Sequence, residues 1–318
     1  MHAESFPFMT DWLRRMTERR KSFRSLWRKL FALEQWRIGI ADCPIHDFLA
    51  TPDQISFRWM GGTAPREILA DPFAIETNSG LRIFAEKLVH GRTRGQIVEV
   101  DDAAGSSHTR MFHAAGYHLS YPFTVADRDG LFVIPEQAQS GRVAFYRYDG
   151  TLNADPAATI EGLDGLDPTV VEHDGKWWLF CTRLSDRPGE ALYLYYADAL
   201  LGPYIPHPLN PVVVDPGRAR PAGRIICREG RLLRPGQDGR VTYGGAITLC
   251  EIESLTVTHY RERPIASITP DMVAGAWPDG LHTLEHTAHH VLIDTKRYVF
   301  HPLAFVFKLI DRMARRTV

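Results

Sequence analysis

A short phrase recurs along this chain at nearly even intervals. Each copy has a polar residue and a proline, a short apolar strand, a turn that ends in glycine, and a second apolar strand. The polar anchors, which lie 50, 46 and 53 residues apart, are Asp71, Tyr121, Asp167 and Arg220. A degenerate fifth copy begins at Gly280 and contains His282. Strand-rich repeats of this length are typical of β-propellers, in which each blade needs its neighbours to bury its faces. The repeat therefore predicts an all-β fold, a five-bladed β-propeller.

Each unit has the chemistry of a β-hairpin. In the third copy, Glu-His-Asp-Gly175 separates two apolar runs, and the glycine supplies the positive φ that a tight turn needs. In a propeller the first strand of each blade lines the central axis, so the side chains at its opening point into one shared pocket. We therefore expect the five anchors Asp71, Tyr121, Asp167, Arg220 and His282 to converge, although they are far apart in the sequence.

Length and composition fit one such domain. Five units of about 50 residues occupy residues 36–304, a size that single β domains often reach. The formal net charge of −1 gives no general attraction to nucleic acid, and we expect no such partner. The four cysteines, Cys43, Cys181, Cys227 and Cys250, form no C-x-x-C pair, which favours reduced core residues. The start of the chain lacks the pattern of a secretory signal, so we expect a cytoplasmic protein.

Both ends of the chain depart from the repeat. In the N-terminal segment, residues 1–35, positions 12–31 carry eight Lys or Arg against one Glu, and residues 305–318 form a second basic amphipathic stretch. We expect short basic helices at both ends. Such helices can lie on an anionic bilayer, here the inner membrane face. Alternatively, they pack on the outside of the propeller or mediate self-association. No run of about 20 uncharged apolar residues predicts a membrane-spanning helix.

Five motifs, taken together and in their order, resemble those of a known family. They are Ala-Asp71-Pro-Phe with Glu86, Ser-Tyr121-Pro-Phe with Glu136, Leu-Asp167-Pro-Thr, Leu-Gly202-Pro-Tyr, and the stretch from Arg220-Pro-Ala-Gly-Arg224 through Leu-Arg234-Pro-Gly-Gln237-Asp238 to Tyr243. Over roughly residues 36–300 the chain resembles the N-terminal propeller module of plant glucosamine inositolphosphorylceramide transferases and their bacterial relatives. That module is similar to the five-bladed propeller of glycoside hydrolase family 43. The resemblance implies a carbohydrate pocket on the propeller axis.

The same resemblance implies roles for several carboxyl groups. Inverting glycosidases use one carboxylate as general base and one carboxylic acid as general acid. Asp71 matches the base of family 43, and Asp167 matches the aspartate that orients the site and raises the pKa of the acid. The glutamate acid has no clear counterpart, because arginines stand in that region. Glu86 and Glu136, each 15 residues after its own anchor, are candidate substitutes. This departure argues against ordinary hydrolysis.

Arginines near the repeated phrases suggest an anionic ligand. Arg183, Arg220, Arg224 and Arg234 stand where strands near the axis begin or end. A guanidinium binds carboxylate or phosphate through paired donors, so an anionic sugar, a sugar phosphate or a glycolipid head group would suit them. Alternatively, some of them pair with acidic residues and hold the blades in register. The remaining candidate ligand-binding residues are Tyr121, Gln237, Asp238 and His282.

A metal or a cofactor is not expected. His282, His286, His289 and His290 have a spacing that binds zinc on a helix. Here they fall where the repeat predicts strand and turn, and positions i and i+4 of a strand lie about 13 Å apart. The sequence also contains no phosphate-binding glycine loop, nucleophile elbow or dinucleotide fingerprint.

Two functions remain open. The chain is either an enzyme of glycoside hydrolase or glycosyltransferase type, or a module that binds a glycan or glycolipid for a separate glycosyltransferase. Convergence of acids with arginines exceeds what recognition alone requires and favours the enzyme.

Overall fold

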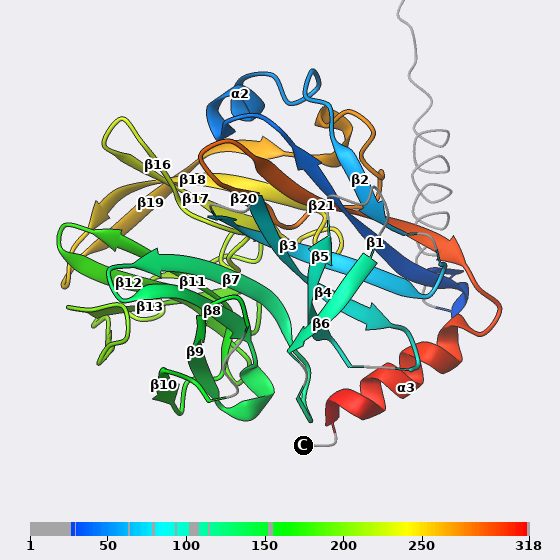
Figure 1. The fold of residues 1–318 in the computed structure, drawn as a ribbon, viewed down its shortest axis with the longest axis horizontal. Helices are drawn as coiled ribbons and strands as arrows, with labels where there is room; N and C mark the ends of the chain where they lie inside the picture. Colours follow the sequence, from blue (N-terminus) through cyan, green and yellow to red (C-terminus); the bar gives the residue numbers. More distant parts are fainter. Residues whose placement is uncertain are drawn as a thin grey trace, which may run out of the picture.

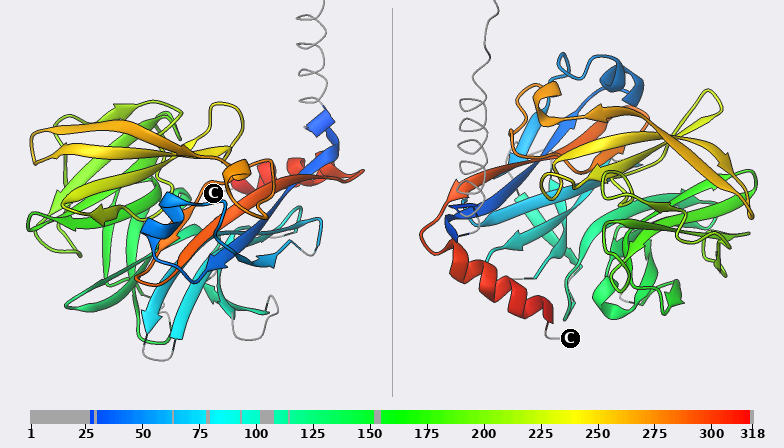
Figure 2. Two further views of the ribbon diagram at one scale, coloured as in Figure 1. Left: turned by 90° about the horizontal axis from the view of Figure 1, so that it is seen from above. Right: turned by 180° about the vertical axis from the view of Figure 1, so that it is seen from behind.

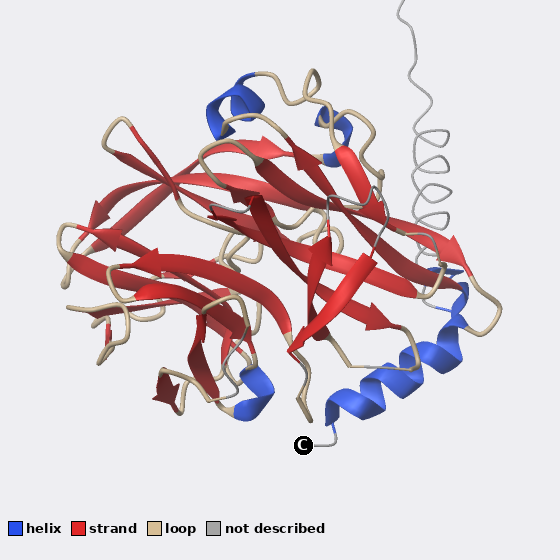
Figure 3. Ribbon diagram, in the orientation of Figure 1, coloured by secondary structure: helices blue, strands red, loops and turns tan. Residues whose placement is uncertain are grey.

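The computed structural model describes residues 27–28, 30–62, 64–77, 80–92, 94–101, 108–113, 115–151 and 155–316. Strands make up most of this part of the chain, and its few helices lie toward the periphery (Figure 1, Figure 3). The prediction of a mainly β fold is therefore confirmed. Among the described residues, no helix is long and apolar enough to cross a membrane.

The strands form four hydrogen-bonded sheets. The largest contains β20 (Leu284–His286), β21 (Val291–Phe300), β1 (Ala32–Ala41), β3 (Glu67–Thr77), β4 (Gly80–Val89), β5 (Gln96–Asp101) and β6 (His108–His113), with β2 (Arg58–Gly61) beside β1. The second contains β7 (Ser120–Asp127), β8 (Gly130–Glu136), β9 (Arg142–Tyr148) and β10 (Ala158–Glu161). The third contains β11 (Gly165–His173), β12 (Lys176–Arg183), β13 (Ala191–Ala197), β14 (Ile205–Pro206) and β15 (Val213–Val214). The fourth contains β16 (Ile226–Arg228), β17 (Arg231–Asp238), β18 (Ala246–Leu255) and β19 (Tyr260–Ile268).

The eight-stranded sheet joins the two ends of the repeat region. Its strands β20, β21, β1 and β2 form one group and β3 to β6 another, and a single parallel pair, Trp36 with Ile68, connects them. Strand β1 pairs with β21 over ten residue pairs, from Ala32–Phe300 to Ala41–Val291. Residues 32–35, which we expected to be helical, therefore belong to β1, because they complete the pairing with the last strand.

The anchors occupy an unusual backbone conformation. Asp71, Tyr121 and Asp167 have φ values of +50°, +44° and +51°. Each lies at a shift in the register between the first and second strands of its sheet, which is a β-bulge. Each is followed by a proline, which lacks an amide donor and is tolerated where the ladder is interrupted. The anchors therefore lie within their strands, and the expectation that they stand at the strand openings is wrong.

The core lies between neighbouring sheets. One apolar cluster joins β7, β8, β11 and β12 through Phe123, Phe132, Val170 and Leu179. Cys181 and Cys250 are buried as predicted, whereas Cys43 is half-buried and Cys227 is exposed.

Two helices flank the sheets. Helix α2 (Ile45–Ala50) buries Phe48, and α3 (Ala304–Arg316) follows β21 at the edge of the molecule (Figure 1, Figure 2). Two short 3-10 helices cover Ala138–Ser140 and Pro270–Met272. Most of the expected N-terminal helix, up to residue 26, lies outside the described residues.

Tyr121 ties three sheets together from a fully buried position. Its hydroxyl lies 2.8 Å from Thr169 Oγ1 on β11 and accepts a hydrogen bond from the backbone amide of Gly223 at 2.7 Å. Its own amide donates to Asp71 Oδ2 at 3.2 Å. The role of Tyr121 that the structure shows is thus to cross-link inner strands.

Replacing Tyr121 with phenylalanine should lower the free energy of unfolding by about 1–3 kcal/mol, because the buried Gly223 amide loses its acceptor. Chemical denaturation measures this loss. As a control, Tyr193→Phe removes a hydroxyl that bonds the half-exposed Asp186, where water can replace it. Equal stability of Tyr121→Phe and wild type would show that the cross-link is unimportant.

Candidate functional site

A cavity of about 520 Å³ opens between the sheets; strands of three sheets line its wall, and the fourth sheet contributes Tyr243 from the loop between β17 and β18. The residues that give it chemical character are Trp36 on β1, Glu86 on β4, Glu136 on β8, Arg220, Tyr243 and His282. Tyr243, in the loop between β17 and β18, lines the cavity and is 47% exposed as a residue. We call this space the axial cavity.

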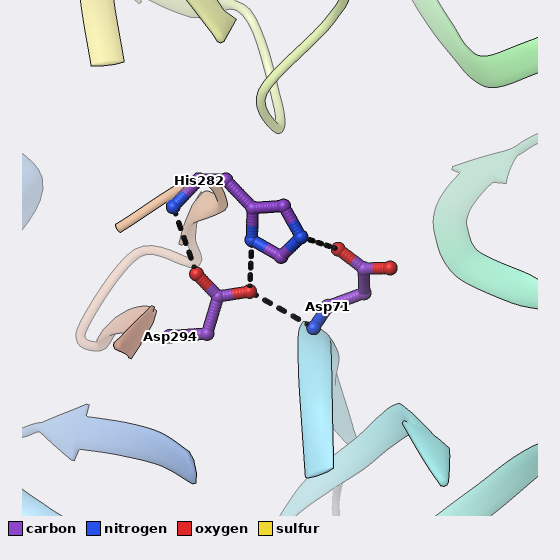
Figure 4. Close-up of side chains that lie close together, drawn as sticks. All are labelled: Asp71, His282 and Asp294. Carbon is purple, nitrogen blue, oxygen red and sulfur yellow. Dashed lines mark hydrogen bonds and ion pairs between the residues drawn. The ribbon is translucent and has the colours of Figure 1, made fainter. Parts of the chain in front are cut away.

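His282 lies between two buried aspartates (Figure 4). Its Nδ1 is 2.6 Å from Asp294 Oδ2, and its Nε2 is 3.6 Å from Asp71 Oδ1. Burial alone would lower the pKa of His282, but the charges of Asp294 and Asp71 raise it to about 9. His282 is therefore an imidazolium at neutral pH.

Asp294 organises the backbone around this histidine. Its Oδ1 accepts the amides of His282 and Thr283, each at 3.0 Å, and its Oδ2 accepts the amide of Asp71 at 3.1 Å. Although burial alone would raise the pKa of Asp294, the charge of His282 and these hydrogen bonds lower it. The ionised Asp294 thus holds His282 next to Asp71 in strand β3.

Asp71, the candidate base, lies behind the cavity wall. Its side chain is 6% exposed, and its oxygens accept from Thr283 Oγ1 at 2.8 Å and from the Tyr121 amide. Burial raises the pKa of Asp71 to about 6, against the opposing effect of His282. A carboxylate with both oxygens engaged and little access to water is poorly placed to activate a water molecule.

Asp71, His282 and Asp294 are also the one group in the described part of the chain whose possible metal-ligand atoms lie within 4.8 Å of one another. A protonated imidazole cannot bind a metal, and its charge already offsets part of the negative charge of the carboxylates. The arrangement therefore fits a protonated histidine better than an ion. The described histidines 286, 289 and 290 do not join this group.

A second charged group surrounds Asp167. Arg220 binds Asp167 in a bidentate manner, with Nε–Oδ2 and Nη2–Oδ1 distances of 2.6 and 3.0 Å, and it reaches Glu136 Oε2 at 3.3 Å. Gln237 donates to Asp167 Oδ2 at 2.7 Å. Arg220 thus lies directly against Asp167, the candidate orienting aspartate.

Glu136 is the cavity-facing carboxyl of this group. Burial and the nearby Asp167 raise the pKa of Glu136 well above its usual range, although Arg220 opposes the shift. These effects favour the neutral, protonated form of Glu136. Glu86, the other glutamate that the sequence suggested, also lines the cavity. Its Oε1 lies 3.3 Å from His118 Nε2.

Three of the four predicted arginines are absent from the wall of the axial cavity. Arg183 binds Asp164 at 2.8 Å, and Arg224 binds Glu285 at 2.7 Å. Arg234, 1% exposed, makes two 2.7 Å hydrogen bonds to Glu262. These three arginines pair with acidic residues, as the structural alternative expected, so the prediction that the four arginines lie together around one pocket is wrong. Asp238 likewise binds Arg240 and does not line the cavity.

Several site residues were missed from the sequence. Asp294, Thr295 and Lys296 form a run of polar residues within the apolar strand β21, and all three are 0% exposed. A polar run in the middle of a buried strand indicates paired charges, so it was a usable signal. Trp36 and Tyr243 carried no such signal, because aromatic residues are common in any core.

The charge pattern predicts a pH dependence of stability. The folded-state pKa of His282, about 9, lies above its unfolded value near 6.5, so the stabilisation is complete below that value and is lost as the pH rises through 9. Between pH 6.5 and 10 the free energy of unfolding should fall by about 3 kcal/mol. Denaturant titrations should show that His282→Gln removes this fall and that His46→Gln, at an exposed site, keeps it. A fall of the same size in His282→Gln would contradict the assignment.

Comparisons with known proteins agree with the sequence resemblance. The family model described as glucosamine inositolphosphorylceramide transferase 1, N-terminal, matches residues 32–290. The protein named glucosamine inositolphosphorylceramide transferase 1 from Oryza sativa subsp. japonica is 30% identical over 217 residues, which cover 64% of this chain and 29% of the relative. The protein of that name from Arabidopsis thaliana is 29% identical over 207 residues, covering 62% and 27%. The chain thus spans less than a third of the length of these relatives.

Among solved structures, the chain is similar to an exo-β-1,3-galactanase from Clostridium thermocellum, with a TM-score of 0.48 and 13% identity over 70% of this chain and 56% of that one. It is also similar to a family 117 glycoside hydrolase from Zobellia galactanivorans, with a TM-score of 0.48 and 13% identity over 84% and 90%. The family assignment follows from the sequence matches: this chain belongs to the family of the N-terminal domain of glucosamine inositolphosphorylceramide transferase 1.

Proposed function

We propose that this chain is a carbohydrate-active protein that binds a saccharide in the axial cavity. We also propose that the eight-stranded sheet represents two blades, because one parallel residue pair is its only link between β1 and β3. Together with the other three sheets this gives a five-bladed propeller, whose axis is the cavity. Membership of a family named for a glycosyl transferase supports a carbohydrate ligand.

One observation carries the proposal. The axial cavity combines an exposed aromatic ring, Tyr243, with hydrogen-bonding groups from separate sheets, namely Glu86, Glu136 and Arg220. Sugars present apolar C–H faces and a rim of hydroxyl groups, so aromatic rings and fixed polar groups are what a saccharide site needs.

The charge of the cavity refines the ligand class. Arg220 is the one predicted arginine in the wall, and its guanidinium already binds Asp167 and Glu136. An anionic substituent would compete with these carboxyl groups. We therefore place recognition in hydroxyl hydrogen bonds and ring stacking, with one arginine available to an acidic sugar or to the head group of a glycolipid.

Catalysis is a second candidate function, which one observation favours. Glu136 faces the cavity, and its environment raises its pKa, as the general acid of a glycosidic bond requires. The buried position of Asp71 weighs against hydrolysis, since the candidate base has both oxygens bonded. Glycosyl transfer, or binding for a separate glycosyltransferase, fits this geometry better than cleavage by water. The curated relatives are much longer than this chain, so they can contain a further domain that would act with this one.

Tyr243→Ala should weaken saccharide binding about tenfold or more, because the ring is the exposed aromatic surface of the cavity. Calorimetric titration with neutral, amino and acidic monosaccharides and their oligomers measures the affinity. Val241→Ala, two residues away and 96% exposed, is the matched control and should bind as wild type does. Failure of the wild type to bind any saccharide in the panel would overturn the proposal.

Glu136→Gln separates the two functions. If Glu136 is the acid, the variant should lose about 10²–10⁴-fold in turnover of an aryl glycoside or a lipid-linked saccharide, while its saccharide affinity changes little. Equal turnover of wild type and variant would rule out this role and leave binding alone.

A further inference from the structure

Helix α3 packs on the sheets through a mixed side, which combines polar contacts with the buried Ala304 and the ring of Phe307 beneath the Arg66 guanidinium. Asp311 Oδ2 lies 2.8 Å from His90 Nδ1, and Asp311 Oδ1 accepts the backbone amide of Gly91 at 2.7 Å. Lys308 Nζ donates to the carbonyl of Arg28 at 2.9 Å. These polar contacts fix one face of the helix on the body of the protein.

The opposite side of α3 is apolar and faces outward. Phe305, Val306, Leu309 and Ile310 are 56%, 45%, 46% and 42% exposed. At about 100° per residue they cover roughly 140° of the helix circumference. An ordinary surface helix exposes mainly polar residues on its outer side, whereas α3 exposes this apolar stripe. We call this exposure of the stripe the reversed orientation of α3.

The apolar surface continues onto residues next to the helix. Leu303 and Phe300 are 52% and 60% exposed, and Trp27, 38% exposed, stacks on Phe300 with ring centroids 6.2 Å apart. We call this set, with the four exposed residues of α3, the α3 face. Contiguous exposed apolar surface of this kind marks a site of interaction with a protein or a membrane.

Charge decides between these partners. The segment 305–316 carries Lys308, Arg312, Arg315 and Arg316 against a single acid, Asp311, which is engaged with His90 and Gly91. The exposed Trp27 belongs to a sequence segment, residues 12–31, that carries eight Lys or Arg against one Glu. Apolar side chains beside an excess of basic residues match the surface of an anionic bilayer, whose head groups attract cations and whose interface accepts tryptophan and phenylalanine.

We propose that the α3 face docks on the surface of an anionic lipid bilayer, with Phe305, Val306, Leu309 and Ile310 in the interface. Helix α3 lies along the bilayer and does not cross it. The bond from Asp311 to His90 keeps the helix in its reversed orientation. His90, which binds Asp311 of α3, also lines the axial cavity. Docking of the α3 face therefore brings the bilayer close to that cavity.

Co-sedimentation of the full chain with vesicles tests this. Wild-type protein should sediment with phosphatidylcholine vesicles that contain phosphatidylglycerol and much less with pure phosphatidylcholine. Leu309→Glu with Ile310→Glu should bind the anionic vesicles at least about tenfold more weakly. The matched control, Ile205→Glu with Leu209→Glu, changes two residues that are 50% and 51% exposed elsewhere and should bind as wild type does.

Three results would overturn the proposal. Wild-type protein that stays in the supernatant would mean that another segment, such as residues 1–26, covers the face. Unchanged binding by the α3 variant would place any membrane contact elsewhere. A wild-type dimer that the α3 variant dissociates, seen by size-exclusion chromatography, would make the face an interface between copies. Melting curves check folding, and Leu309→Gln with Ile310→Gln repeats the test without added charge.

Discussion

Buried charge at the centre of the molecule is the constraint on which the rest of the structure depends. The inner strands bring together five buried carboxyl groups, those of Asp71, Glu136, Asp167, Glu285 and Asp294. Three cations, His282, Arg220 and Arg224, pair with them. Buried charges without partners are strongly destabilising. The network therefore forms only when the sheets that carry these residues are packed together.

If all five carboxyl groups were ionised, they would outnumber the three cations. Protonation of some of the carboxyl groups reduces this excess of negative charge. Burial raises the pKa of Asp71 to about 6 and that of Glu285 to about 7, each against the effect of its cationic partner. Burial and the nearby charge of Asp167 also raise the pKa of Glu136. The neutral form is thus favoured for the carboxyl that faces the axial cavity, which links the packing of the centre to the chemistry available to a ligand.

Backbone geometry makes this packing possible. Asp71, Tyr121 and Asp167 lie at bulges with positive φ, which interrupt the ladder at the same place in three successive sheets. Close approach of the strands also requires glycine: a Cβ on Gly223 would lie 1.9 Å from the carbonyl oxygen of Leu284. A larger residue there would push the inner strand that carries Glu285 away from Arg224.

The repeat made the strand content and the contacts among the anchors predictable, because a fixed period with alternating apolar residues determines where inner strands start. Arg220 with Asp167 and His282 with Asp71 are such contacts. The partners of Arg183, Arg224 and Arg234 were not predictable, since a long side chain on a strand reaches acids on either neighbour, and those acids lie outside the repeated phrase. The reversed orientation of α3 was equally hidden, because amphipathicity tells which side of a helix is apolar but not which side meets the protein.

A crystal structure of the protein with its tightest-binding saccharide tests the central claim most directly. The account predicts the sugar in the axial cavity, with one face on Tyr243 and its hydroxyl groups within hydrogen-bonding distance of Glu136 or Arg220. A saccharide bound on the outer surface, with the cavity unchanged, would contradict it.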